Sequence, residues 1–152
     1  MPPGLWLVNI LFQRVCRINA AIPWMVHFTS HVSGRVEIGR HVWISFAVSG
    51  GCYIQGINGI RIGDETIFAP GVKIISANHD ARCLERRVEA PGISIGSRCW
   101  LGANAVVLPG VTLGDDVIVA AGAVVTKSFP AGVTVSSVPA RAISAGTPAD
   151  VV

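Results

Sequence analysis

A six-residue period runs through the stretch "IGSRCWLGANAVVLPGVTLGDDVIVAAGAVV", which covers residues 95–125. A large aliphatic residue opens every repeat: Ile95, Leu101, Val107, Leu113, Val119 and Val125. Neither an α-helix, with about 3.6 residues per turn, nor a strand, with side chains alternating every two residues, has this spacing. The period favours a coil with three flat sides, in which each side is a short strand. Each corner is a turn, and small residues suit such turns because they leave room for the backbone.

A second block upstream keeps the same period in its own register. Seven of its nine repeats open on a large apolar residue: Val26, Val32, Ile38, Ile44, Ile62, Phe68 and Ile74. The other two open on Gly50 and Gly56. We expect the opening residue of each repeat to point inward and to stack on its equivalent three repeats later. Successive coils would then pair as parallel strands about 4.8 Å apart.

The period breaks once, between Ile74 and Ile95. These residues are 21 positions apart, which is three repeats and three extra residues. The intervening segment "NHDARCLERRVEAPG", residues 78–92, carries six of the chain's 12 basic and 9 acidic residues. A polar loop expelled from an apolar coil is a common place for functional residues, because the rigid scaffold positions it.

The repeats approximate one pattern: an aliphatic residue, then glycine or another small residue, then two variable positions and a small or β-branched residue. This pattern resembles the hexapeptide-repeat acyltransferases over about residues 26–136. The resemblance implies an all-β chain folded as a left-handed parallel β-helix, with a short N-terminal helix and one extruded loop. Stacked coils bury their surface only against their neighbours, so both ends need caps. The expected parts are an N-terminal helical lead or cap at 1–25, a first β-helix block at 26–77, an extruded active-site loop at 78–92, a second β-helix block at 93–136 and a C-terminal tail at 137–152.

The residues beside the inward row should point outward, and in the second block most of them are apolar. They are Trp100, Val106, Thr112, Ile118 and Val124. Four apolar residues of five are too many for a face left in water, so we expect this side to be buried against another subunit. The resemblance implies a homotrimer around a threefold axis, with active sites at the subunit interfaces.

His79 opens the polar loop, in the sequence "SANHD". By itself a histidine in a polar loop is most often only solvated, but this one lies at the exit of a coil beside the expected interface. It resembles the active-site histidine of the hexapeptide acyltransferases, and the resemblance implies a general base. A neutral imidazole can take a proton at physiological pH. The adjacent Asn78 and Asp80 are candidates for binding the substrate.

The remaining histidines and the cysteines show no metal-binding pattern. The carbonic-anhydrase relatives within this fold use three zinc-binding histidines, and no matching cluster follows His79, so we expect no metal. His27 and His31 could line an acceptor pocket or cap the first coil, and we expect the cap. His41 falls at a turn position, where we expect it to be solvated. The four cysteines have no C-x-x-C spacing, which favours free thiols in a reducing cytoplasm.

The C-terminal stretch "VVTKSFPAGVTVSSVPARAI" resembles the region after the last coils of acetyl-CoA-dependent xenobiotic, maltose and galactoside acetyltransferases. When the groove residues of those enzymes are matched to this sequence position by position, the resemblance implies a coenzyme A groove. It would be lined by Trp100, Ala103, Ala121, Thr126, Lys127 and Arg141. Lys127 and Arg141 can meet the phosphates of coenzyme A, while the small alanines leave room for its slender pantetheine arm. Ser144 departs from the galactoside enzymes, which have a basic residue there. A short apolar lead also replaces their long N-terminal helical region, and the chain resembles more closely the acetyltransferases of exopolysaccharide and colanic-acid biosynthesis.

The N-terminal segment "MPPGLWLVNILFQRV" is apolar but has no basic leader region and no small-residue cleavage site. Arg14 and Arg17 keep its apolar run well short of the roughly 20 residues that a membrane-spanning helix needs. We expect a short amphipathic helix that packs against the body or a neighbouring subunit, in preference to one that rests on a membrane surface. A net charge of +3 without a basic run gives no support to a nucleic-acid partner.

These features predict a cytoplasmic, acetyl-CoA-dependent O-acetyltransferase that acts on a sugar or polysaccharide precursor. Transfer would be direct, with His79 as the general base and no covalent enzyme intermediate. N-acetylation of an amino sugar would use the same residues and stays open. A non-catalytic hexapeptide-repeat scaffold is the third alternative, and it would bind no coenzyme A and would have no use for His79, Trp100 or Lys127.

Overall fold

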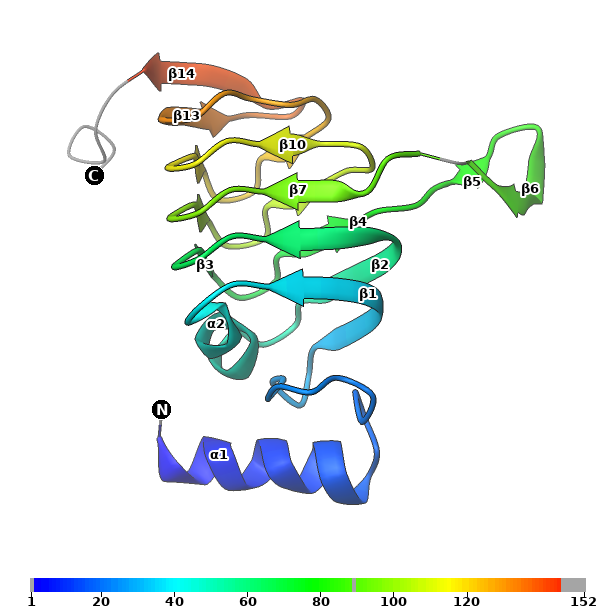
Figure 1. Ribbon diagram of the computed structural model, residues 1–152, viewed down its shortest axis with the longest axis vertical. Helices are drawn as coiled ribbons and strands as arrows, with labels where there is room; N and C mark the ends of the chain where they lie inside the picture. The colour runs from blue at the N-terminus through cyan, green and yellow to red at the C-terminus, as the bar shows by residue number, and fades with distance from the viewer. Residues whose placement is uncertain (1, 89, 146–152) are drawn as a thin grey trace.

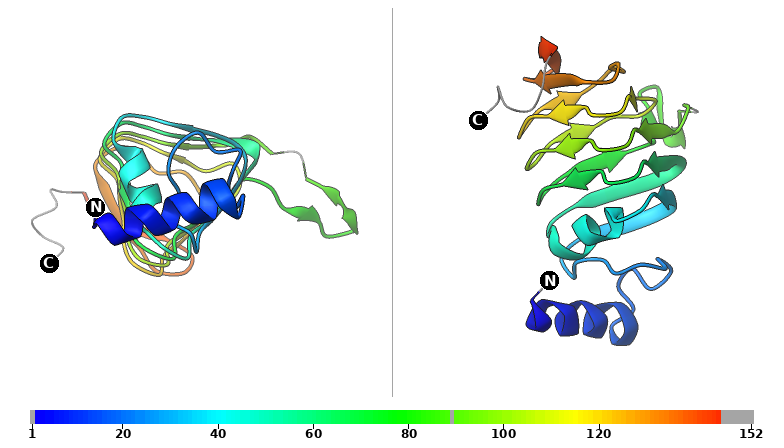
Figure 2. Two further views of the ribbon diagram at one scale, coloured as in Figure 1. Left: turned by 90° about the horizontal axis from the view of Figure 1, so that it is seen from below. Right: turned by 60° about the vertical axis from the view of Figure 1, so that its left-hand side comes forward.

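The computed structural model describes residues 2–88 and 90–145, and the regular secondary structure of this part of the chain is mostly β-strand (Figure 1). Short parallel strands stack in successive turns of one coil, as the repeat predicts (Figure 2). Residue 89 of the predicted loop and residues 146–152 of the predicted tail lie outside the described residues.

The strands form three faces of the coil. Face I contains the second halves of β1 (His31–Ile38) and β2 (Tyr53–Ile62), then β7 (Ile93–Ile95) and β10 (Thr112–Leu113). Face II contains the first halves of β1 and β2, then β4 (Lys73–Ile75), β9 (Val106–Val107) and β12 (Val124–Val125). Face III contains β3 (Ile67–Phe68), β8 (Trp100–Leu101), β11 (Ile118–Val119) and β13 (Val133–Ser136), with β14 (Arg141–Ala145) added antiparallel.

The register of the parallel strands follows the repeat. In the second block Trp100 pairs with Ile118 and Val106 pairs with Val124, and both pairs join residues three repeats apart. The inward residues of this block are at most 1% exposed: Ile95, Leu101, Val107, Leu113, Val119 and Val125. Their predicted inward orientation is confirmed. Burial of such aliphatic side chains, at about 1.5–3 kcal/mol each, is the main force that holds successive turns together.

One repeat of the first block departs from the expected strand. Residues Val42–Val48 form helix α2, after His41 in a left-handed conformation with a φ of 63°. Helical spacing turns Val42 and Phe46 toward the core, whereas Ile44, which we expect to point inward, is exposed. That expectation is wrong because the side-chain period changes with the backbone. The Phe46 ring meets the Phe68 ring edge-to-face at 4.9 Å between centroids, and so fills the N-terminal end of the coil.

The outward row is also less uniform than its sequence indicates. Trp100 is exposed and Val106 and Val124 are half-buried, but Ile118 is only 8% exposed. Ile118 lies in the ladder between Trp100 and Thr134, which shield it within the same chain. The expectation that Ile118 is free to meet another subunit is therefore wrong.

Helix α1 (Pro3–Ile10) and the π-helical turn η1 (Leu11–Val15) lie across the N-terminal end of the coil (Figures 1 and 2). They meet the body through two buried polar side chains, Asn9 and Gln13. Asn9 donates from Nδ2 to the Ala47 carbonyl oxygen at 2.9 Å and accepts from the Phe28 N–H at 3.1 Å. Gln13 bonds backbone groups of the following segment: the carbonyl oxygens of Ile22 and Trp24 and the N–H of Val26. The expected N-terminal helix packs on the body, but with its polar side chains inward.

Helix α1 is too short to cross a membrane. The same holds for every helix within residues 2–88 and 90–145.

Candidate active site

A hairpin leaves the coil between β4 and β7 and extends to one side (Figures 1 and 2). It consists of β5 (His79–Asp80) and β6 (Cys83–Arg87), which pair antiparallel. Its root is the buried Ser76, whose Oγ donates to the Gln55 carbonyl oxygen at 2.8 Å and accepts from the Asn58 N–H at 2.9 Å. Asn58 also donates from Nδ2 to the Ser76 carbonyl oxygen at 2.9 Å. The previous turn of the coil therefore holds the point where the hairpin begins.

The His79 side chain is exposed, and one backbone contact fixes its tautomer. Its Nδ1 lies 2.6 Å from the Leu84 carbonyl oxygen, across the hairpin. A carbonyl oxygen can only accept, so Nδ1 carries the hydrogen and donates it. In the neutral ring the lone pair is then on Nε2, on the side of the imidazole away from Leu84. This is the form that a general base requires, with a second group orienting the ring.

The two neighbours of His79 stabilise the hairpin. The Asn78 carbonyl oxygen accepts from the Val88 N–H at 2.9 Å, and Asp80 Oδ1 accepts from the Arg82 N–H at 2.8 Å. The second bond closes the turn between β5 and β6, a common use of an aspartate at such a position. These bonds show structural roles for Asn78 and Asp80, and their contact with substrate stays a prediction.

An apolar cavity of about 370 Å³ lies where face III turns into face II. It is lined by Ala69, Trp100, Gly102, Ala103, Ile118, Val119, Ala120 and Ala121. Trp100, Ala103 and Ala121 are three of the predicted coenzyme A residues, and the structure brings them together. The resemblance does not identify the other five. A signal for three of them does exist, because Ala69, Gly102 and Ala120 each follow an inward residue of the repeat.

The cavity suits a slender chain. Its walls are mostly backbone and small side chains, and Trp100 supplies one broad exposed aromatic surface. Small walls keep backbone groups within reach of an amide-bearing ligand, and an aromatic ring can cover its apolar parts.

The other three predicted coenzyme A residues do not line this cavity. Thr126, Lys127 and Arg141 are all exposed. Thr126 and Lys127 follow β12 at the corner between faces II and I, and the Lys127 Nζ lies 5.6 Å from the centroid of the Phe129 ring. Arg141 opens β14, where it pairs with Ser136. A phosphate-binding role for the two basic side chains stays a prediction.

His79 and the apolar cavity are also separate within one chain. None of the described residues between 76 and 92 lines the cavity. The hairpin leaves the corner between faces II and I, whereas the cavity occupies the corner between faces III and II. One chain by itself therefore does not bring the predicted base to the predicted donor groove.

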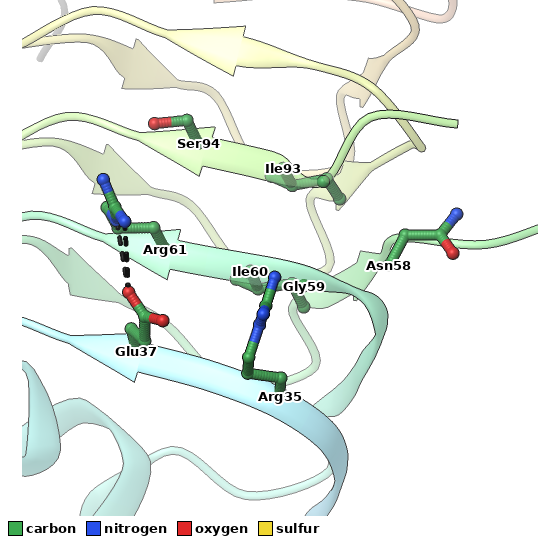
Figure 3. A pocket seen from close by; sticks show the side chains of 9 residues that line it. Arg35, Glu37, Asn58, Gly59, Ile60, Arg61, Ile93 and Ser94 are labelled. Carbon is green, nitrogen blue, oxygen red and sulfur yellow. Dashed lines mark hydrogen bonds and ion pairs between the residues drawn. The ribbon is translucent and has the colours of Figure 1, made fainter. Parts of the chain in front are cut away.

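A second, polar cavity of about 220 Å³ lies on face I beside the root of the hairpin (Figure 3). Arg61 pairs there with Glu37 at 3.3 Å. Arg35 extends over the backbone of Gly59, and among the described residues it has no ion-pair partner. The guanidinium of Arg35 and the amide of Asn58 can bind hydroxyl or anionic groups.

Several other side chains that could perform chemistry are buried or paired. Burial raises the pKa of the Cys52 and Cys99 thiols, which keeps them in the weakly nucleophilic thiol form. His27 Nδ1 lies 2.9 Å from the Thr29 hydroxyl, and His41 Nδ1 lies 2.8 Å from the Glu65 carboxylate. Within the described part of the chain, no group of three or more His, Cys, Asp or Glu side chains is placed to hold a metal ion.

Known proteins share these features with the chain. Residues 92–127 match the family model described as the hexapeptide repeat of succinyl-transferase. Nodulation protein L of Rhizobium leguminosarum bv. viciae is 37% identical over 142 residues, which cover 91% of this chain and 72% of that protein. A protein of Escherichia coli strain K12, named as a lipopolysaccharide biosynthesis O-acetyl transferase, WbbJ, is 32% identical over 163 residues, with 90% and 83% covered. The chain belongs to the hexapeptide-repeat acyltransferases.

A solved structure agrees with this assignment. A hexapeptide-repeat-containing acetyltransferase of Vibrio cholerae O1 biovar eltor, in complex with acetyl coenzyme A, matches with a TM-score of 0.64 and 28% identity. The match covers 76% of this chain and 62% of that chain. Nodulation protein L of Rhizobium meliloti strain 1021 is 38% identical over 110 residues, which cover 70% of this chain but only 57% of that protein. The chain thus spans little more than half the length of some of its relatives.

Proposed function

We propose that this protein is an acetyl-CoA-dependent O-acetyltransferase that acts on a sugar or polysaccharide precursor. Family membership supports acyl transfer, and the name of the Escherichia coli relative points to O-acetylation of a saccharide. The observation that carries the proposal is the contact between His79 Nδ1 and the Leu84 carbonyl oxygen, which leaves Nε2 able to accept a proton. A scaffold without chemistry would not need an exposed, tautomer-fixed histidine on a rigidly rooted hairpin.

The proposed transfer is direct. The acceptor hydroxyl oxygen attacks the thioester carbonyl carbon while His79 Nε2 takes the hydroxyl proton. A backbone N–H beside the groove would stabilise the negative charge on the tetrahedral intermediate. The C–S bond then breaks, the imidazolium returns its proton to the coenzyme A sulfur, and the acetyl ester leaves with the acceptor. No cysteine nucleophile takes part, in keeping with the buried Cys52 and Cys99.

The donor would lie along the apolar cavity, with its pantetheine arm against Ala103 and Ala121 and its thioester end toward the neighbouring hairpin. Thr126, Lys127 and Arg141 would meet the nucleotide end, where two exposed basic side chains suit the phosphates. Binding of acetyl coenzyme A to the Vibrio cholerae relative, of the same fold, supports this use of the coil.

We further infer that the coil is the left-handed parallel β-helix of the family and that three chains assemble around a threefold axis. The separation of His79 from the cavity supports this assembly, because a neighbouring chain can bring its hairpin to the groove. The exposed Trp100 and Ile67 side chains on face III, and the half-buried Val106 and Val124 on face II, would then be covered. A cytoplasmic location is supported by four unpaired cysteines.

The test is an acetyl-transfer assay with the purified protein, acetyl-CoA and a panel of acceptors. The panel contains neutral oligosaccharides, nucleotide sugars and amino-sugar nucleotides, and release of free thiol reports turnover. We expect thiol release with a hydroxyl-bearing acceptor and an acetyl group that mild alkali removes from the product, because esters hydrolyse there and amides do not. An alkali-stable product would identify N-acetylation. A protein that binds no acetyl-CoA and releases no thiol with any acceptor would be a scaffold.

A further inference from the structure

The two side chains that the N-terminal helical segment buries most deeply are polar, while several of its large apolar side chains are exposed to solvent. Asn9 and Gln13 are buried, and their side chains bond the backbone at the open end of the coil. A surface helix normally does the reverse and buries its apolar stripe. The arrangement has a local reason, since the first turn of the coil leaves backbone groups unpaired and two amide side chains satisfy them.

The outward side carries a continuous row of large apolar side chains. We call it the apolar stripe, and it consists of Leu7, Leu11, Val15 and Ile18. These side chains are 39–70% exposed, and Trp6 beside them is exposed as well. The spacing of four residues keeps Leu7, Leu11 and Val15 on one side of the helical segment, and Ile18 follows in the turn after it. An uncovered row of this kind indicates a docking surface.

The place of the stripe limits what can cover it. The helix lies across the end of the coil (Figures 1 and 2). Helical spacing places Leu7, Leu11 and Val15 on the side opposite Asn9 and Gln13. A chain that packs beside this one, along faces II or III, would not reach it. The occupant must therefore approach along the axis of the coil. A flat surface can contact the helix from this direction without colliding with the rest of the coil.

The charge around the apolar stripe indicates which kind of surface covers it. No Asp or Glu occurs before Glu37, while Arg14 and Arg17 flank the apolar stripe and are exposed. Two such stripes facing each other from two copies would bring four arginines together without a compensating acid. An apolar row edged by arginine and by one tryptophan matches the interface of a membrane with anionic lipids, where the apolar side chains enter the acyl boundary and the cations meet phosphate.

We propose that the apolar stripe docks the protein on the surface of an anionic lipid bilayer. The helix lies in the plane of the interface and does not span it. This role is independent of the proposed acetyl transfer, and its failure would leave that proposal unaffected. It would place the hairpin and the cavities of the coil within a short distance of saccharides assembled at a membrane.

Vesicle co-sedimentation tests the proposal with the full chain. We expect the protein to pellet with vesicles of phosphatidylcholine and phosphatidylglycerol in equal parts, and to stay in solution with phosphatidylcholine alone. The pelleted fraction should fall as salt is raised, because the arginine contribution is screened. The double variant Leu7→Gln/Leu11→Gln should lower the partition coefficient at least tenfold. The matched control is Leu84→Gln, which changes a leucine that is 72% exposed on the hairpin and should leave partitioning unchanged.

Two further measurements separate the alternatives. Vesicles with brominated acyl chains should quench the tryptophan fluorescence of the protein, and Trp6→Phe should remove most of that quenching. Light scattering gives the molar mass in the absence of vesicles. Wild-type protein that stays in solution with both kinds of vesicle would overturn the proposal. A molar mass that falls to half in Leu7→Gln/Leu11→Gln would also overturn it, because a second copy would then cover the stripe.

Discussion

His79 shows how one backbone contact can define the chemistry of a side chain. The imidazole has two nitrogens of similar basicity, and only the Leu84 carbonyl oxygen at 2.6 Å from Nδ1 distinguishes them. That oxygen belongs to the opposite strand of the hairpin, so pairing of β5 with β6 also sets the orientation of the ring. The contact cannot be removed by changing the Leu84 side chain, which makes His79 itself the residue to vary.

We expect His79→Ala to lower turnover by roughly 10²–10⁴, the usual contribution of a positioned acid–base group. Affinity for acetyl-CoA should not change, because the proton moves only in the transition state. His79→Asn should be nearly as slow, since an amide can donate to the Leu84 oxygen but cannot take up the proton. Steady-state kinetics and calorimetry measure the two quantities. His41→Asn is the control, and near-normal turnover in His79→Ala would contradict the general-base role.

The predicted donor groove can be tested by a substitution at a single residue, Ala121. The variant Ala121→Leu adds three carbons to the wall of the apolar cavity and should weaken acetyl-CoA binding at least tenfold, about 1.4 kcal/mol. Ala131→Leu is the matched control, because Ala131 is also exposed but does not line the cavity. Calorimetric titration with acetyl-CoA measures both. Equal affinities in the two variants would mean that the donor binds elsewhere.

The turns of the coil depend on close approach between backbones at particular glycines. Gly34 in β1 has a φ of 76°, and a Cβ there would collide with the backbone of Gly56 in β2. Gly51 has a similar φ of 68°, but a Cβ there would meet nothing within 4 Å. Substitutions at Gly51 and Gly34 therefore separate the free-energy cost of a left-handed backbone from the free-energy cost of a collision.

We expect Gly51→Ala to destabilise the protein by about 1 kcal/mol through backbone strain alone. Gly34→Ala should cost about 2–4 kcal/mol, because the same strain is joined by a clash that only a shift of β1 against β2 can relieve. Chemical unfolding followed by circular dichroism gives both free energies of unfolding. Equal losses in the two variants would show that β1 and β2 can move apart without cost.

The corner where face I turns into face III is held by polar contacts between successive turns. Asp64 accepts from the Arg40 N–H at 2.8 Å and pairs with the Arg40 side chain at 3.0 Å. The Arg40 N–H, and then the Arg40 side chain, hold the pKa of Asp64 below its usual value of 3.8. The Arg98 side chain likewise lowers the pKa of Asp116.

A lowered folded-state pKa means that the charged carboxylates stabilise the protein at pH values above about 4 and lose this effect as pH falls further. We therefore expect Asp64→Asn/Asp116→Asn to be less stable than the wild type at pH 7. The difference should shrink as pH is lowered through 4 toward 2. Both groups are exposed, so the effect should be small and weaker at high salt. Thermal unfolding across this pH range checks it, and parallel curves for the two proteins would contradict it.

At the scale of the whole molecule, we expect the proposed active site to need more than one chain. The hairpin with His79 and the apolar cavity belong to different corners of the coil, and none of the described hairpin residues lines that cavity. A symmetric ring of chains can place every hairpin against the groove of its neighbour. Such an assembly makes the site a property of the oligomer and allows a test by mixing.

We expect a trimer by light scattering, and we expect two impaired variants to restore each other when the assay uses an acetyl-CoA concentration too low for Ala121→Leu to bind. Trimers formed from equal amounts of His79→Ala and Ala121→Leu chains, mixed after unfolding and refolding, should regain activity. If hairpin and cavity come from adjacent chains, about a quarter of the sites in random trimers combine an intact His79 with an intact groove. If both come from one chain, no site does, and the mixture stays as inactive as its parts.

The six-residue period by itself predicted the coil and the buried aliphatic row. A coil with one inward side chain on each flat side buries apolar residues that recur every six positions. The break between Ile74 and Ile95, with its charges, equally located the hairpin and drew attention to His79. The small residues after the inward positions predicted the corners of the coil, and three of them, Ala69, Gly102 and Ala120, line the cavity in the structure. All of these are local signals that repeat or interrupt a pattern along the chain.

Only the tertiary structure decided the features that depend on partners distant in sequence. Helix α2 replaces a strand because Phe46 packs against Phe68, and this moves Ile44 out of the core. Helix α1 turns its amides inward because the end of the coil has backbone groups to satisfy, 19 to 38 residues away from Asn9. The Nε2 atom of His79 is free to accept a proton because the Leu84 carbonyl oxygen, across the hairpin, bonds Nδ1. The repeat predicts which residues are buried. The backbone groups that remain unpaired at the end of the coil and in the hairpin are set only when the chain has folded.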